Sequence, residues 1–171
     1  MNTNIYISKK LEKIIKFPTP ETQEFVKLSH LNKWNANVFY VNHKRCLIIT
    51  NSKTKYSVLI SKMTISDFKN LSSIFIKSFQ EQLKADCILV DLTTINRIIG
   101  SVKVYTTNND KSVIGIQNNI LSYIDDWKYE FGNIDNWNFK DINCRINNIP
   151  YKQIDWKFPK EKMNELIKTS V

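Results

Sequence analysis

The sequence predicts an α+β protein in which a small, mainly antiparallel sheet is covered by helices. Residues 34–60 read as a meander of three short strands, because runs rich in Val, Ile, Phe and Tyr are separated by two polar turns. Residues 64–84 and 109–131 instead repeat their apolar side chains every three to four positions, as helices do. Strands followed by a series of helices are typical of the α+β class.

The chain before the meander predicts one further strand and a helix. Residues 5–7 alternate as a short strand, and Ser8 is a suitable N-cap for the helix that follows. Pro18 and Pro20 are expected to end this helix. Its inward positions are Leu11, Ile14 and Ile15. Residues 21–33 read as a polar connection.

The turns of the meander are expected near Asn42–Arg45 and Asn51–Thr54, whose residue types tolerate turn geometry. After the meander, Thr64 and Asp67 form a capping-box pattern that opens a helix. The apolar stripe of that helix is Phe68, Leu71, Phe75, Phe79 and Leu83.

The second half predicts more helices and one more strand. Asp91 and Gly100 suit the two ends of a short helix, and residues 101–106 alternate as a strand. Asn109 or Asp110 begins the longest helix. The inward positions of the short and the long helix are Leu92, Ile95, Ile98 and Ile99, then Val113, Ile116, Ile120, Ile124, Trp127 and Phe131.

Two more helices complete the order. Gly132 ends the longest helix, Pro150 closes the next one, and Pro159 occupies the first position of the last. Their inward positions are Phe139, Ile142, Ile146 and Ile149, then Met163, Leu166 and Ile167. No linker or shift in composition divides the chain, so we expect a single α+β domain over residues 1–171.

Composition favours a cytoplasmic protein. No apolar window is long enough to span a membrane, and the N-terminus lacks the features of a secretory signal. Cys46, Cys87 and Cys144 are odd in number and lie far apart among apolar neighbours, which predicts buried, free thiols in a reducing compartment.

The net charge of +9 favours an anionic partner, although 22 lysines and only 3 arginines supply the positive charge. Phosphate and base recognition prefer the planar fork of Arg. The 24 Ile and 20 Asn residues indicate AT-rich codons, which also enrich Lys. Codon usage therefore accounts for part of the charge, and binding of RNA or DNA remains an open alternative.

The residues of the meander resemble a family of small bacterial domains of unknown function. The matching positions are Trp34, Ala36, Asn37, Val38, Phe39, Lys44, Arg45, Thr50, Asn51, Thr54, Tyr56 and Ser57, with Asn109, Ser112, Val113, Ile146, Asn147 and Pro150 further on. Such domains occur alone or fused to plasmid-encoded domains. The resemblance implies a bacterial or phage source and the company of mobile elements, but no reaction.

The motifs of common catalytic chemistries are missing. His30 and His43 are too few for a zinc site, and three glycines cannot supply a phosphate-binding loop or a nucleophile elbow. Asp-x-Lys triplets begin at Asp67, Asp126 and Asp155, as expected by chance in a lysine-rich chain. We therefore expect no catalytic residue, no metal site and no cofactor.

Two functions remain. The first is a non-enzymatic binding or regulatory protein that acts on a protein or nucleoprotein partner, as an anti-CRISPR protein or an antitoxin does. Its expected binding residues are Lys44, Arg45, Lys53 and Lys55, which we place in one positive patch on neighbouring turns, and Tyr56 as an aromatic contact. The alternative is a small metal-independent ribonuclease-like toxin that uses His43 as general acid or base.

Overall fold

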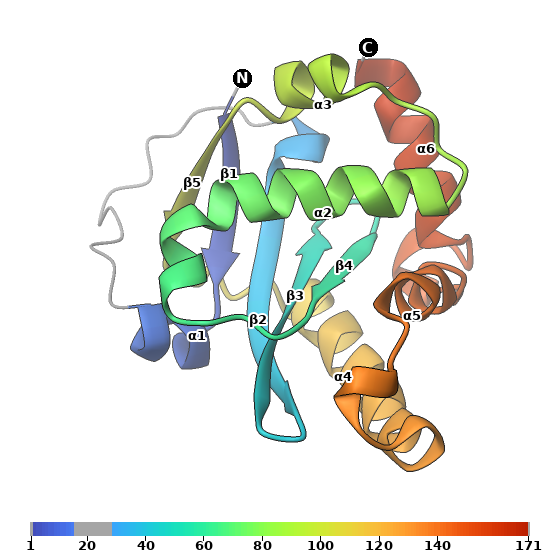
Figure 1. Cartoon of the computed structure of the whole chain (residues 1–171). Coiled ribbons are helices and arrows are strands. Elements are labelled where there is room, and N and C mark those ends of the chain that lie inside the picture. Colours follow the sequence, from blue (N-terminus) through green and yellow to red (C-terminus); the bar gives the residue numbers. More distant parts are fainter. Residues whose placement is uncertain (1, 16–28, 171) are drawn as a thin grey trace.

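Figure 1 shows the computed structural model of the chain, which describes residues 2–15 and 29–170. Five strands form one sheet in the order β4-β3-β2-β1-β5, with helices against both faces. The strands are β1 (Asn2–Ile7), β2 (Lys33–Val41), β3 (Lys44–Asn51), β4 (Ser57–Ile60) and β5 (Ser101–Tyr105). The helices are α1 (Lys9–Ile15), α2 (Leu71–Ala85), α3 (Leu92–Ile99), α4 (Lys111–Phe131), α5 (Phe139–Ile146) and α6 (Pro159–Ser170).

The predicted meander is confirmed. Strands β2, β3 and β4 pair antiparallel, with Val38 opposite Leu47 and Ile49 opposite Val58. The β2–β3 hairpin turns through Asn42 and His43, which have φ angles of 47° and 62°. Two consecutive positive φ angles match the twist of the flanking strands.

The expectation of a mainly antiparallel sheet is wrong, because the sheet is mixed. Strand β1 runs parallel to β2 on one side and to β5 on the other. Parallel neighbours need a crossover connection, and α1 lies in the chain between β1 and β2. The pairing of β1 with β5 joins residues about a hundred positions apart, which no local pattern of the sequence specifies.

One core lies between the sheet and the face covered by α1, α2, α3 and α6. The indole ring of Trp34 is fully buried at its centre, and the ring centroids of Phe75 and Phe79 lie 4.9 and 5.2 Å from it. The whole stripe predicted for α2 is buried, as expected. Figure 1 shows α2 crossing in front of the strands.

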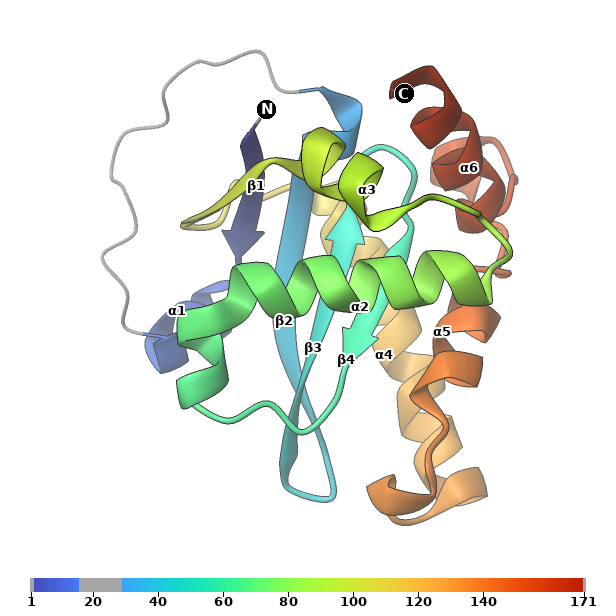
Figure 2. The same cartoon turned by 45° about the horizontal axis from the view of Figure 1, so that its top comes forward.

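A second core fills the opposite face, where α4 and α5 pack on β2, β3 and β4 (Figure 2). Ile116, Ile120 and Ile124 of α4 face Phe39 and Ile48 of the strands. Trp127 and Phe131 pack at the margin of this core and are half-buried. Helices α4 and α5 therefore turn toward the sheet the stripes that their spacing predicts.

The predicted helix ends form, with one difference. Asp91 accepts a hydrogen bond from the Thr94 amide at 2.8 Å, and Asp110 caps α4 in the same way. Thr64 and Asp67 make their reciprocal bonds, but these precede a 3₁₀ turn at Ser66–Asn70 rather than α2 itself. The other 3₁₀ turns are His30–Asn32, Ile134–Asn136 and Lys152–Ile154.

Two burial predictions are wrong. Leu92 is 46% exposed although it shares a face with Ile95 and Ile99, because it occupies the first position of α3, at the end of the helix. Cys87 is exposed just after α2, while Cys46 is buried and Cys144 is intermediate. Pro18, Pro20 and most of the connection 21–33 lie outside the described residues.

Strand β4 is an edge strand, and two asparagine side chains of α5 bind its free backbone groups. Asn143 accepts from the Leu59 amide at 2.7 Å and donates to the Leu59 carbonyl at 3.1 Å. Asn147 makes the same pair of bonds with Ser57, at 2.8 and 2.9 Å. Both asparagines are almost completely buried. The helix thus takes the place of a sixth strand, which removes an edge that would otherwise be open to pairing.

We predict that Asn147→Ala lowers the free energy of unfolding by about 2–4 kcal/mol, because it leaves the buried amide and carbonyl of Ser57 without partners. Urea unfolding of the variant measures this loss. The control is Asn148→Ala, which removes the exposed neighbouring amide and should change stability by less than about 0.5 kcal/mol. Equal losses in the two variants would contradict the role of Asn147.

Candidate binding surface

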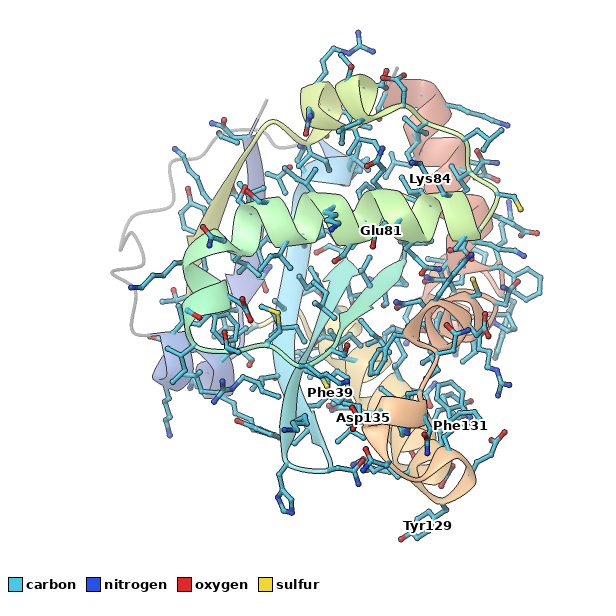
Figure 3. All side chains as sticks on the ribbon, in the orientation of Figure 1. Phe39, Glu81, Lys84, Tyr129, Phe131 and Asp135 are labelled. Atoms are coloured by element: carbon cyan, nitrogen blue, oxygen red, sulfur yellow. The ribbon has the colours of Figure 1, made fainter. Side chains whose placement is uncertain are left out.

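The β2–β3 hairpin borders a groove of about 550 Å³ at one end of the sheet. The segment that follows β4 forms the other wall, and the 3₁₀ turn at Ile134–Asn136 contributes Asp135. The lining residues are Tyr40, His43, Lys44, Arg45, Lys62, Met63, Thr64, Ile65 and Asp135. Below, this surface is called the hairpin groove. Figure 3 shows Asp135 beside the hairpin, on the same side as Phe39.

Hydrogen bonds to backbone amides fix the hairpin against both of its neighbours. The side-chain oxygen of Asn42 accepts from the Ile134 amide at 2.8 Å. On the other side, the Met63 amide donates to the Arg45 carbonyl at 2.8 Å. The residues of the hairpin groove are therefore held by three separate parts of the chain, and they form a defined surface.

Positive charge dominates the hairpin groove. Among its described residues, Lys44, Arg45 and Lys62 are cations and Asp135 is the single carboxylate. Asp135 binds Lys62 at 2.5 Å. The hydrogen bond from Lys62, with its charge and that of Lys44, holds the pKa of Asp135 below its ordinary value. Asp135 is therefore ionised at neutral pH and offsets one of the three cations.

Arg45 has unused donors. Its Nη1 donates to the Met63 carbonyl at 3.3 Å, while its buried Nε has no partner among the described residues. A guanidinium carries five donors, and buried donors are normally paired. Arg45 is thus anchored through Nη1. Its buried Nε cannot reach a partner outside the protein, so a contact with an anion comes from the remaining guanidinium donors.

Two exposed apolar side chains accompany these charges. Tyr40 is 37% exposed, and the Lys10 ammonium of α1 lies 5.1 Å from the centroid of its ring. Ile65 is 64% exposed on the opposite wall. An aromatic face next to cations is the arrangement on which unpaired nucleotides stack, and it also suits protein contacts.

Lys53 and Lys55 lie at the other end of β3, so the expected single patch is wrong. Strand β3 spans eight residues, which places its two ends roughly 23 Å apart. Lys44 and Arg45 begin the strand, whereas Lys53 and Lys55 belong to the β3–β4 turn. Lys53 is exposed, but Lys55 is 5% exposed and donates to the Ser52 carbonyl at 2.6 Å.

Tyr56 is fully buried and offers no surface on which a partner can stack. Its hydroxyl donates to the Asp86 carboxylate at 2.5 Å, and Gln82 donates to the same oxygen at 3.0 Å. Burial, and then the charge of Asp86, raise the pKa of Tyr56 well above its ordinary value. The geometry therefore assigns Tyr56 to the core.

Asn51 organises the β3–β4 turn, and reasoning from the sequence did not single it out for this role. Its side-chain oxygen accepts from the amides of Lys53 and Thr54 and from the Thr54 hydroxyl. Its amide nitrogen donates to carbonyl oxygens of residues 30–33, at the start of β2. A turn signal at Asn51 was visible in the sequence, but its long-range partners were not.

The described residues contain no helix that is long and apolar enough to cross a membrane. Over the same residues, no three His, Cys, Asp or Glu side chains come together where they could hold a metal ion. The Asp-x-Lys triplets are spread apart, since Asp67 lies in a 3₁₀ turn, Asp126 in α4 and Asp155 in the loop before α6.

Residues 4–162 match the model of a family described as a domain of unknown function, DUF6933. The chain belongs to this family. No match was found among curated proteins or among solved structures. The expected kinship with an uncharacterised family is thus confirmed for most of the chain.

Several of the positions that resemble the uncharacterised family make hydrogen bonds that hold this DUF6933 fold together. The Trp34 indole donates to the Leu31 carbonyl at 2.6 Å, and the hydroxyl oxygens of Thr50 and Ser57 lie 2.9 Å apart. Ser57 is also the backbone partner of Asn147. These residues hold strands, turn and helix together, so their contacts are structural.

We predict that Tyr56→Phe lowers the free energy of unfolding by about 1.5–3 kcal/mol at pH 7, because it removes a bond to a charged acceptor. The loss should shrink as the pH rises above about 10, where the unfolded wild-type chain releases the Tyr56 proton and the folded chain keeps it. Wild type therefore loses stability more steeply than the variant in this range. Urea unfolding between pH 7 and 11 measures both effects.

The matched control is Tyr129→Phe, since Tyr129 is 93% exposed and points away from the molecule in Figure 3. It should leave both the stability and its pH dependence unchanged. A Tyr56→Phe protein that behaves like this control would show that the bond to Asp86 contributes nothing.

Proposed function

We propose that this chain is a non-enzymatic binding protein of bacterial or phage origin, which acts on a nucleoprotein or protein partner through the hairpin groove. The observation that supports this most is the composition of the groove, where three cations and two exposed apolar side chains share a surface with one carboxylate that is already paired. An inhibitor of a nucleoprotein complex, such as an anti-CRISPR protein, or an antitoxin fits this chemistry.

The partner surface is anionic and presents unpaired bases or flat apolar groups. Lys44 and the free donors of Arg45 suit phosphate oxygens. Tyr40 suits a stacked base, because its ring is partly exposed and belongs to a cationic surface. The Lys10 ammonium lies near this ring. Single-stranded RNA in a ribonucleoprotein offers both features.

His43 lacks the neighbours that the ribonuclease alternative needs. It is exposed at the hairpin tip, and general acid–base cleavage requires a second positioned acid or base within hydrogen-bond reach. Among the described residues that line the groove, Asp135 is the only carboxylate, and its oxygen is engaged by Lys62. This arrangement favours binding over catalysis.

The proposal is tested with a fluorescent single-stranded RNA of about twenty nucleotides, titrated with protein at several salt concentrations. Lys44→Gln/Arg45→Gln should weaken binding at least tenfold. It should also lower the slope of log Kd against log salt by about 1–2, because binding releases fewer counterions when phosphate contacts are lost. Lys44→Gln alone, which leaves the Arg45–Met63 bond intact, should lower the slope by up to about 1.

The control is Lys69→Gln/Lys84→Gln, which removes the same charge from exposed positions in the 3₁₀ turn before α2 and in the last turn of α2. It should retain most of the affinity. If both double variants bind alike, net charge alone attracts the RNA and the groove is not the site.

We further predict that the protein cleaves no RNA and that His43→Ala leaves both binding and any inhibitory effect intact. Inhibition of a partner enzyme should rise to a plateau near equimolar protein, as a stoichiometric complex requires. Electrophoresis of labelled RNA after incubation with excess substrate measures cleavage. Multiple turnovers that His43→Ala abolishes would establish the ribonuclease alternative instead.

A further inference from the structure

The β3–β4 turn lies at the end of the sheet opposite the β2–β3 hairpin (Figure 1). Three lysines are near this turn. Lys33 begins β2, while Lys53 and Lys55 belong to the turn. Lys33 and Lys53 line a depression of about 220 Å³ together with Ser29, His30, Ser52 and Asp110. Below, this surface is called the turn pocket.

The turn pocket holds an excess of positive charge. Burial lowers the pKa of Lys55 below its ordinary value, and the charges of Lys33 and Lys53 lower it further, while Asp110 acts in the opposite direction. In and behind the turn pocket, three ammonium groups are therefore offset by a single carboxylate, that of Asp110. Asp110 is itself engaged as the N-cap of α4, where it accepts from the Val113 amide at 3.2 Å. The first turn of that 21-residue helix adds the positive end of its dipole.

Each of the three ammonium groups has a different position relative to the turn pocket. Lys53 is exposed at its rim. Lys33 also lines it, with its ammonium 6.0 Å from the ring centroid of Tyr6. Lys55 lies behind the wall, because its ammonium donates to the Ser52 carbonyl. Direct contacts with a ligand therefore come from Lys33 and Lys53, and Lys55 contributes its charge from within the protein.

A buried donor beside this region has no partner. The side-chain nitrogen of Asn108 is buried and makes no hydrogen bond within the described residues, although its oxygen accepts from Asn35 at 2.6 Å. Asn35 in turn accepts from the Ser52 hydroxyl at 3.0 Å, which connects Asn108 to the wall of the turn pocket. Unpaired buried donors are rare in folded proteins, so this amide marks a polar region behind the wall of the turn pocket.

We infer that the turn pocket binds a phosphate group, held by Lys33 and Lys53 at its rim and attracted by the charge of Lys55 behind it. Its volume is below the roughly 300–1,000 Å³ typical of small-molecule sites, so it suits an ion-sized group rather than a whole nucleotide. Free phosphate and the terminal phosphate of a nucleic acid share this chemistry. The inference does not depend on the hairpin groove, which involves none of these residues.

The test is calorimetric titration of the full chain with inorganic phosphate, comparing wild type with Lys33→Gln/Lys53→Gln. The double variant should bind phosphate at least tenfold more weakly, because it loses both direct cations. Lys69→Gln/Lys84→Gln removes equal charge from positions that do not line the turn pocket, and it should bind as wild type does. If the two double variants have the same Kd, or if wild type itself binds no phosphate, the inference is overturned.

A second readout follows the Lys55 ammonium by NMR. Phosphate should raise the pKa of Lys55 in wild type, since an anion nearby stabilises the charged form, and it should not do so in Lys33→Gln/Lys53→Gln. No change in wild type would contradict a site at the turn. Six-nucleotide oligothymidylates with a 5′-phosphate or a 5′-hydroxyl distinguish the sources. If only the 5′-phosphorylated oligomer displaces inorganic phosphate, the ligand is the phosphorylated end of a nucleic acid. If neither oligomer displaces it, the ligand is free phosphate.

Discussion

The pairing of α5 with the edge of the sheet is the constraint on which the second half of the molecule depends. Residues four apart in a helix are separated by about 6 Å along its axis, and residues two apart in a strand by about 6.7 Å. Asn143 and Asn147 therefore meet Leu59 and Ser57 in register. Each amide side chain has the donor and acceptor of a peptide group, so α5 continues the hydrogen-bond pattern of the sheet.

This contact places the other elements of the second core. With α5 fixed beside β4, Ile142 and Ile146 enter the core that α4 forms on the sheet, and Cys144 approaches Gln82 of α2 at 3.4 Å. Gln82 also donates to Asp86, the acceptor of the Tyr56 hydroxyl. The polar contacts at this edge thus link α2, β4 and α5. A buried network of this kind specifies one arrangement of the layers, because every alternative leaves some of its groups unpaired.

Local signals in the sequence were sufficient for the elements but not for their arrangement. The caps at Asp91 and Asp110 and the stripe of α2 depend on neighbouring residues, and they were predicted correctly. Asn143 was one of 20 asparagines whose number codon usage explains, and Asn147 was noted only as a position of the family resemblance. A signal did exist, since these two amides recur four residues apart next to Ile142 and Ile146 on the buried side of a helix. Their partners in β4 lie more than 80 positions earlier, which no local pattern reveals.

The same limit explains the outcome for the expected binding residues. The two basic turns are only a few residues apart in the sequence, but strand β3 lies between them and places them at opposite ends of the sheet. At physiological ionic strength the screening length is about 8 Å, so charges at the two ends of β3, roughly 23 Å apart, interact very little. The positive charges of the hairpin groove and those of the turn pocket therefore act independently of each other. A partner gains from both only if it spans the full length of β3, since avidity requires that the sites be engaged at once.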